Sequence, residues 1–179
     1  MQLWTLGHGT ASESELAALL QSQGIENVVD VRKIPKSGKH PHVWAEKMAL
    51  WVPTLSGATY EWHPEFGGFR KADPDSPNVA LRNTSFRAYA DYMQTPQFLG
   101  AFDELMRRAE QSRIAIMCSE SVWWRCHRRL MSDAATLLHD ADVQHIMHTG
   151  KTTPHKLTEG VRVTGQGVLQ YDAGEERLL

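Results

Sequence analysis

The first 31 residues of the chain alternate between an apolar run, an amphipathic segment and a second apolar run. Residues 2–6 are mostly apolar and stop at a Gly-His-Gly turn, and residues 27–31 are rich in β-branched side chains. Between them, Ser12-x-x-Glu15 is a capping box that precedes leucines at helical spacing, and Gly24 ends the segment. Strand, helix and strand with short joins predict a βαβ unit, in which the two strands are parallel neighbours.

The rest of the chain continues this alternation. Further strands are expected at residues 59–63, 113–117 and 143–148, and helices at residues 45–55, 86–93, 96–108 and 126–138. The pattern predicts a single three-layer α/β domain over residues 1–179, with a mostly parallel sheet of about five strands and helices on both faces. Residues 151–179 have little apolar periodicity, so we expect a peripheral C-terminal extension with a small hairpin at residues 161–171.

Composition narrows the class of protein. A length of 179 residues with 41% hydrophobic content suits one compact domain. No stretch approaches the roughly 20 apolar residues of a membrane helix, and the N-terminus does not resemble a signal peptide. We therefore expect a cytoplasmic protein with no membrane partner, whose two cysteines are reduced thiols. A net charge of −2 argues against a general nucleic-acid coat.

Chemically active side chains follow the expected strands, one strand after another. His8 follows the first strand, Asp30 and Arg32 end the second, and Cys118 and Glu120 follow the fourth. In sheets of this kind ligands bind outside the carboxyl ends of the strands. The recurrence predicts one cleft, surrounded by these residues and three more: Arg70, His127 and Arg128.

Several of these segments together resemble a known family. They are Thr5-Leu6-Gly7-His8-Gly9-Thr10, Val29-Asp30-Val31-Arg32, Gly67-Gly68 with Arg70, Tyr89-Ala90-Asp91-Tyr92-Met93, and Met117-Cys118-Ser119-Glu120 through Trp124-x-Cys126-His127-Arg128. The chain is similar in these motifs to the bacterial domain-of-unknown-function family 488 (DUF488). The resemblance implies an α/β fold and no established reaction.

The segment from Cys118 to Arg129 admits three interpretations. In the first, the segment helps to form an anion pocket, in which Arg32, Arg70, Arg128 and His127 bind a phosphate and Trp124 stacks on a base. In this pocket Cys118, Glu120, Asp30 and His8 are the candidate catalytic groups. The alternative is a purely structural role, in which the arginines lie on a solvated helix face and Asp30 only balances a buried charge.

The second interpretation is thiol chemistry with Cys118 and Cys126, because the start of a helix and nearby cations favour a thiolate. The third is a metal site made of Cys118, Cys126 and His127, with His8 as a fourth ligand. Paired short spacings such as Cys-x2-Cys are typical of structural zinc, whereas this chain has only Cys-x7-Cys. Adjacent residues on a helix also point about 100° apart. We therefore assign no metal ligand and no cofactor.

These arguments favour an enzyme that acts on a phosphate-bearing substrate, a nucleotide or a nucleic acid, in a cleft at the strand ends. The alternatives are a non-catalytic nucleotide or nucleic-acid binding module, and a thiol redox protein that uses Cys118 and Cys126. An anionic small molecule or a nucleic acid is the expected partner. The sequence determines neither the reaction type nor the oligomeric state.

Overall fold

A computed structural model describes residues 1–173 of the chain. Its centre is a six-stranded sheet in the order β3-β2-β4-β1-β5-β6. The strands are β1 Gln2–Gly7, β2 Asn27–Asp30, β3 Thr59–Trp62, β4 Ile114–Cys118, β5 Asp142–Ile146 and β6 Thr152–Pro154. All neighbouring pairs are parallel except β5 and β6, which are antiparallel.

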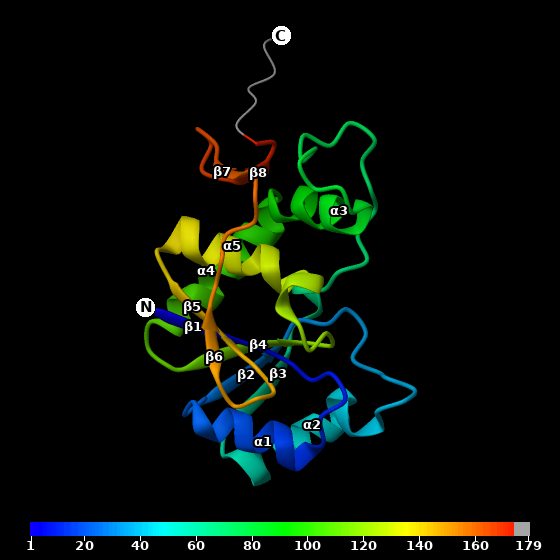
Figure 1. The fold of residues 1–179 in the computed structure, drawn as a ribbon, viewed down its shortest axis with the longest axis vertical. Coiled ribbons are helices and arrows are strands. Elements are labelled where there is room, and N and C mark those ends of the chain that lie inside the picture. The colour runs from blue at the N-terminus through cyan, green and yellow to red at the C-terminus, as the bar shows by residue number, and fades with distance from the viewer. Residues whose placement is uncertain (174–179) are drawn as a thin grey trace.

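Helices cover both faces of the sheet (Figure 1). They are α1 Glu13–Ser22, α2 Ala45–Trp51, α3 Thr84–Met93, α4 Pro96–Ala109 and α5 Arg128–His139. Helices α1 and α2 lie on one face and α3, α4 and α5 on the other, with a hairpin of β7 Val161–Val163 and β8 Leu169–Tyr171 above them (Figure 1). The prediction of a three-layer α/β fold is confirmed, and so is the hairpin.

Short-range signals in the sequence set the starts of two helices. The Ser12 hydroxyl accepts a hydrogen bond from the Glu15 amide at 3.2 Å, and the Glu15 carboxylate accepts one from the Ser12 amide at 2.7 Å. This is the predicted capping box, which satisfies amides at the start of α1 that have no partner within the helix. Thr95 caps α4 in a similar way, ahead of Pro96 at a position where proline loses no hydrogen bond.

The structure corrects three details of the sequence prediction. Strand β4 lies between β1 and β2, so the two strands of the opening βαβ unit are parallel but are not neighbours. The sheet also has a sixth strand, β6, which is only three residues long and ends at a proline, so no periodic pattern indicates it. Helix α5 begins at Arg128 and not at Cys126.

Two hydrophobic cores fill the space between the sheet and its helices, and β4 contributes to both. Ile114, Ile116 and Cys118 belong to the core under α3, α4 and α5, whereas Ala115 and Met117 belong to the core against α1 and α2. This follows from the two-residue period of a strand, whose successive side chains point to opposite faces. Cys118 at the end of β4 therefore faces the layer that contains α5.

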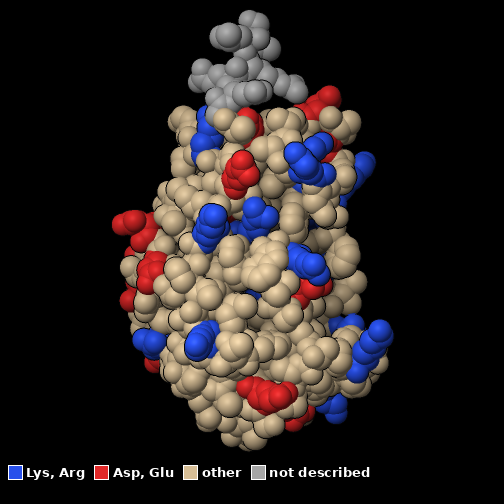
Figure 2. Space-filling model, in the orientation of Figure 1, with Lys and Arg blue, Asp and Glu red and all other residues tan. Residues whose placement is uncertain are grey.

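The face of the molecule shown in Figure 2 has no large area of a single charge sign. Lys and Arg side chains are interspersed with Asp and Glu on the face shown in Figure 2, in keeping with the net charge of −2. Among residues 1–173, no helix has both the length and the apolar character needed to cross a membrane. Residues 174–179 of the expected C-terminal extension lie outside the described part of the chain.

Candidate functional site

The loop between β4 and α5 brings both cysteines of the chain together. It runs from Cys118 through a short 3-10 turn, Trp123–Arg125, to the start of α5 at Arg128. Cys126 has an extended backbone with φ −123° and ψ 152°, and the helical conformation begins only at the next residue. The expected 100° divergence of Cys126 and His127 assumed a helix at both residues. The structure does not have one, so the two side chains turn to the same side.

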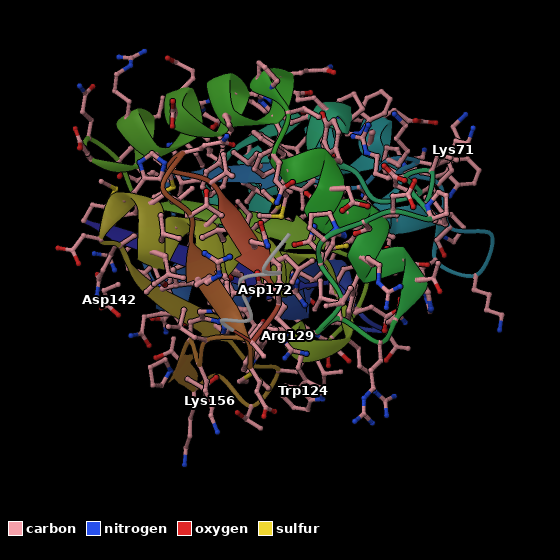
Figure 3. The ribbon with its side chains drawn as sticks, turned by 90° about the horizontal axis from the view of Figure 1, so that it is seen from above. Lys71, Trp124, Arg129, Asp142, Lys156 and Asp172 are labelled. Atoms are coloured by element: carbon pink, nitrogen blue, oxygen red, sulfur yellow. The ribbon has the colours of Figure 1, made fainter. Side chains whose placement is uncertain are left out.

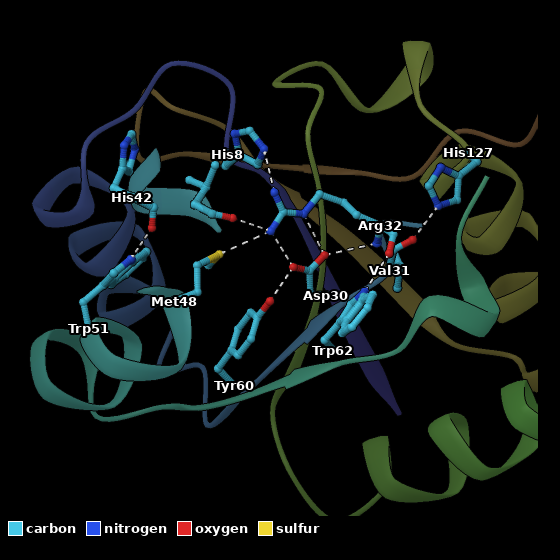
Figure 4. A network of polar contacts seen from close by, with 11 residues as sticks. His8, Asp30, Val31, Arg32, His42, Met48, Trp51, Tyr60, Trp62 and His127 are labelled. Atoms are coloured by element: carbon cyan, nitrogen blue, oxygen red, sulfur yellow. Dashed lines mark hydrogen bonds and ion pairs between the residues drawn. The ribbon is translucent and has the colours of Figure 1, made fainter. Parts of the chain in front are cut away.

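Cys118, Cys126 and His127 form one compact cluster. The His127 Nδ1 atom lies 3.8 Å from Cys118 Sγ and 3.7 Å from Cys126 Sγ, and all three atoms are within 4.8 Å of one another. The His127 Nε2 atom lies 3.2 Å from the Val31 carbonyl oxygen (Figure 4). A carbonyl only accepts, so Nε2 donates in this contact, and Nδ1 faces the two sulfur atoms.

The two thiols differ in acidity because the hydrogen bond between them raises the pKa of one and lowers the pKa of the other. The hydrogen bond with Cys126, followed by burial, raises the pKa of Cys118 well above its ordinary value. Burial acts to raise the pKa of Cys126, but the hydrogen bond from Cys118 and the charges of His127 and Arg128 outweigh it and hold that pKa well below the ordinary value. Within this pair Cys126 is therefore the more acidic thiol.

A pocket of about 260 Å³ opens above this cluster. Its wall contains the three cluster residues together with groups from the loops after β2, β3 and β4 and from α3: Arg32, Lys33, Ile34, Gly68, Phe69, Ser85, Phe86, Tyr89, Ser119, Glu120 and Arg125. Lys33 and Arg125 are exposed, and among residues 1–173 neither makes an ion pair. Phe69 is 89% exposed at a positive φ of 59°, which is an unusual backbone for a bulky side chain.

The loop after β4 is held against the loop after β1 at Gly7. The amide of His8 donates to the Cys118 carbonyl at 3.0 Å, and the Arg128 guanidinium donates to the Glu120 carbonyl. A Cβ atom on Gly7 would lie 1.7 Å from that same Glu120 oxygen, so only glycine fits there. Arg128 is 1% exposed and thus braces the loop from inside.

A second polar cluster lies at the end of β2 (Figure 4). The Asp30 carboxylate accepts from Arg32 Nε at 2.8 Å, from Arg32 Nη2 at 2.5 Å and from the Tyr60 hydroxyl at 2.6 Å. Arg32 Nη1 donates to His8 Nε2 at 3.2 Å, while His8 Nδ1 donates to the Gly9 carbonyl at 2.9 Å. Burial, with a smaller contribution from Arg32, lowers the pKa of His8 to about 4, so this imidazole is neutral at pH 7.

The structure therefore divides the predicted site residues into groups. Cys118, Glu120, His127 and Arg32 line the pocket, whereas Asp30, His8 and Arg128 lie buried beside it and are bonded to other protein groups. Arg70 donates to the carbonyls of Glu65 and Gly67 and stacks 3.4 Å above the Tyr92 ring.

Trp124 does not line the pocket either. It is 47% exposed and points outward from the surface (Figure 3). Its neighbour Trp123 turns inward and stacks on His145, with ring centroids 4.2 Å apart. The tryptophan pair thus presents one free ring to solvent, away from the lining of the pocket.

Sequence reasoning assigned no chemistry to several residues of the site. Tyr89 is 1% exposed, and its ring centroid lies 4.8 Å from that of His127. Lys33 belongs to a basic segment, residues 32–47, but nothing in the pattern distinguished it from the other lysines there. Phe69 stands directly after Gly67-Gly68, and that position at the tip of a glycine-containing loop is the one local signal for it.

Another buried network joins the sheet to α5, and no sequence motif indicated it. The Asp133 carboxylate contacts His155 at 2.9 Å and the Tyr171 hydroxyl at 3.0 Å, and His155 contacts His145 at 3.0 Å. The His145 Nδ1 atom lies 2.7 Å from the Thr5 hydroxyl. Because every member is hydrogen-bonded to another protein group, this network connects β1, β5 and the C-terminal hairpin to α5.

Comparison with known proteins yields one match. A family model described as "Domain of unknown function DUF488" matches residues 13–135, which include β2, β3, β4 and the loop that carries both cysteines. Neither a curated protein nor a solved structure matches the chain.

Proposed function

Since the chain belongs to the DUF488 family, a family of unknown function, we propose its function from the site itself: an enzyme that acts on a phosphate-bearing substrate. The substrate is a nucleotide or a nucleic acid, bound in the pocket at the carboxyl ends of β2 and β4. The protein works in the cytoplasm, where its buried thiols stay reduced.

One observation supports this proposal above the others. The floor of the pocket is made of two thiols and an imidazole whose donor atoms lie within 4.8 Å of one another. A histidine beside a thiol is the arrangement that activates cysteine for chemistry. An inert packing role would not require the two cysteines and His127 to converge on an open pocket.

The rim of the pocket favours an anion joined to a flat apolar group. Lys33 and Arg125 supply two cations without a carboxylate partner in the described residues, and cations of this kind bind phosphate. Ile34 is 66% exposed and Phe69 is 89% exposed at the same rim. A nucleobase can pack on such a surface while its phosphate reaches the cations.

This arrangement revises the predicted roles. Arg32, Arg70 and Arg128 are bonded to protein oxygens, so Lys33 and Arg125 replace them as the phosphate-binding groups. Phe69 replaces Trp124 as the stacking residue. Cys118 and Glu120 remain catalytic candidates, with Cys126 and His127 added, whereas Asp30 and His8 act as positioning residues that hold Arg32.

A pair of charge reversals tests where the substrate binds. Lys33→Glu and Lys39→Glu change the same charge in one loop, but only Lys33 lines the pocket. We expect Lys33→Glu to weaken the binding of nucleotides or short oligonucleotides, measured by isothermal titration, by about tenfold or more, which corresponds to a lost charged contact of about 1.5–3 kcal/mol. Lys39→Glu should bind as the wild type does. Equal weakening by both variants would mean a diffuse electrostatic attraction.

A second comparison separates an enzyme from a binding module. Cys126→Ser should retain ligand binding and lose turnover in a screen of those nucleotides that bind. Full turnover in Cys126→Ser would refute a role for this thiol in the chemistry. Binding without turnover in the wild type would favour the non-catalytic module.

A thiol redox protein is the second candidate, and the contact between Cys118 and Cys126 favours it. Both cysteines are free in the structure. If they form a working dithiol, oxidised glutathione should convert them to an intramolecular disulfide. The glutathione disulfide takes up the two electrons and two protons and leaves as two glutathione thiols, and an excess of reduced glutathione should reverse the exchange. Thiol titration before and after oxidation measures this. A preparation that keeps both thiols through mild oxidation would exclude the redox function.

A further inference from the structure

We propose that Cys118, Cys126 and His127 bind a soft divalent metal ion, with Zn²⁺ the best match, and leave its fourth position open to the pocket. The three groups are the one set of His, Cys, Asp or Glu side chains within residues 1–173 whose donor atoms converge in this way. The inference rests on the proposed function for what the metal does, although not for whether it binds.

The two distances between the imidazole nitrogen and the sulfur atoms match the edges of a zinc tetrahedron. Zn–S bonds of about 2.3 Å and Zn–N bonds of about 2.0–2.1 Å at a tetrahedral angle place sulfur and nitrogen about 3.6 Å apart. The His127 Nδ1 atom lies 3.7 Å from one sulfur and 3.8 Å from the other. The nitrogen and each sulfur are therefore already spaced as two ligands of one zinc ion, and the two sulfurs lie within 4.8 Å of each other.

The imidazole is already oriented as a metal ligand. Metal-binding histidines usually donate the proton of the second ring nitrogen to a carbonyl or a carboxylate, which fixes the tautomer and the ring. His127 Nε2 makes such a contact with the Val31 carbonyl at 3.2 Å, and the Tyr89 ring packs against the imidazole. The lone pair of Nδ1 then points at the two sulfurs without further rearrangement.

The surroundings also suit two thiolates. The Arg128 amide lies 3.5 Å from Cys126 Sγ, and the fixed positive charge of Arg128 lies beside the cluster. Two thiolates and one divalent ion are neutral together, which suits donors as buried as Cys118 and Cys126, at 7% and 3% exposed. Thiolate and imidazole ligands select zinc or another soft ion over Mg²⁺ or Ca²⁺, which prefer oxygen.

Three protein ligands around zinc are typical of a catalytic site, whereas structural sites close all four positions. All three ligands here line the pocket, so the fourth position faces the space where the substrate binds. His8, the fourth ligand considered from the sequence, is bonded to Arg32 and Gly9 and does not close the site. A phosphate oxygen or a water molecule is the remaining candidate for that position.

Cobalt provides a direct test, because Co²⁺ occupies zinc sites and its spectrum reports its ligands. The full chain is stripped with a chelator under reducing conditions and titrated with Co²⁺. We expect one Co²⁺ ion to bind per chain and to give the intense visible bands of tetrahedral cobalt and a thiolate-to-cobalt charge-transfer band. One equivalent of Zn²⁺ should displace the cobalt and abolish these bands. A weak octahedral spectrum, or no saturable binding, would overturn the proposal.

Variants assign the ligands. Cys118→Ser and Cys126→Ser should each reduce the charge-transfer band and weaken binding, and His127→Gln should weaken it by at least the roughly 10–100-fold that loss of a mere supporting contact costs. His139→Gln is the matched control, because His139 lies outside the cluster, near Phe102 and Asp103. Circular dichroism checks that each variant is folded. A wild-type spectrum in folded Cys126→Ser would contradict the ligand set.

The same samples separate failure of the metal site from failure of the proposed function. Nucleotide binding and turnover are measured on the metal-free chain and on the chain loaded with Zn²⁺. Turnover without any metal binding would refute the metal site and leave the enzyme intact. Metal binding with no nucleotide binding in either form would uphold the metal site and refute the proposed substrate.

Discussion

Two buried clusters lie at the ends of neighbouring strands, and they differ in how many strong hydrogen bonds their polar atoms make within the protein. At the end of β2, Asp30 accepts from two nitrogens of the Arg32 side chain and from Tyr60, and Arg32 is also bonded to His8 and to the Val43 carbonyl. At the end of β4, the two thiols have only weak partners: each other, His127 Nδ1 and the Arg128 amide.

The difference shows which cluster stabilises the fold and which is free to do chemistry. A buried ion pair whose hydrogen bonds are all made is a structural element that leaves little capacity for a ligand. Sulfur donors and an imidazole lone pair that meet at an open pocket retain that capacity. Both clusters follow strand ends and both contain ionisable groups, so position in the sequence alone does not separate them.

The largest expected effect comes from breaking the saturated cluster. Asp30→Asn leaves the Arg32 guanidinium buried without its counter-charge, and such a change costs about 3–5 kcal/mol. Cys126→Ser exchanges one small polar atom beside the pocket and should cost only about 1 kcal/mol. Urea denaturation of both variants measures the contrast in the free energy of unfolding.

A surface ion pair provides the control for this comparison. Glu104→Gln removes the partner of Arg107 on an exposed face of α4, where such pairs contribute about 0–1 kcal/mol. If Asp30→Asn destabilised no more than Glu104→Gln, the Asp30 cluster would not be a structural brace. Asp30 would then return to the list of functional groups.

The next effect concerns the carboxylate at the rim of the thiol pocket. Glu120 is exposed, and within residues 1–173 its carboxylate accepts no hydrogen bond, so it does not hold the loop closed. Its backbone carbonyl, which binds Arg128, performs that task. The negative charge of Glu120 beside Arg125 weakens the binding of an anion. Acid–base chemistry on the substrate would explain why a carboxylate stands at this position.

Glu120→Gln should therefore keep the binding of the anionic substrate, or strengthen it, and lose about 100-fold in turnover, the usual scale of acid–base help. Titration calorimetry beside a turnover assay measures the two quantities. Glu13→Gln, a half-buried acid in the first turn of α1 and outside the pocket, is the matched control. Full turnover in Glu120→Gln would remove this residue from the catalytic groups.

The fold could be predicted to a large extent because its signals are local. The capping box at Ser12 and the apolar period of α4 depend on neighbours in the chain, and the structure has both. The insertion of β4 between β1 and β2 could not be predicted, since a strand's place in a sheet depends on contacts with residues far away in the chain. Strand β6 is too short to carry a period.

The site could be predicted only in part, for a related reason. The rule that ligands lie beyond strand ends located Cys118 and Glu120 at the pocket. The rule does not tell which basic side chains are already bonded to protein oxygens, so it included Arg70 and Arg128 and omitted Lys33. The joint orientation of Cys126 and His127 depended on a helix start two residues later than expected, and a shift of that size lies within the ordinary uncertainty of helix ends.

The smallest expected effect is a pH dependence that the saturated cluster has through His8. Burial lowers the pKa of His8 from 6.5 to about 4, and Arg32, Asp30 and His40 are the charged or titratable groups around it. Below pH 6.5 the unfolded chain binds a proton that the folded chain refuses until about pH 4, so the free energy of unfolding falls as the pH drops through this window and levels off below it. The loss is about 1–3 kcal/mol. His8→Asn should flatten this part of the curve, measured by urea denaturation at a series of pH values.

His145 has its pKa lowered to about 3 by burial and provides the parallel case, so His145→Asn should flatten a window that extends further into acid. An unchanged slope in His8→Asn would show that His8 is not held neutral by this cluster, and the contrast between a closed network and an open site would then rest on Asp30 and Arg32 alone.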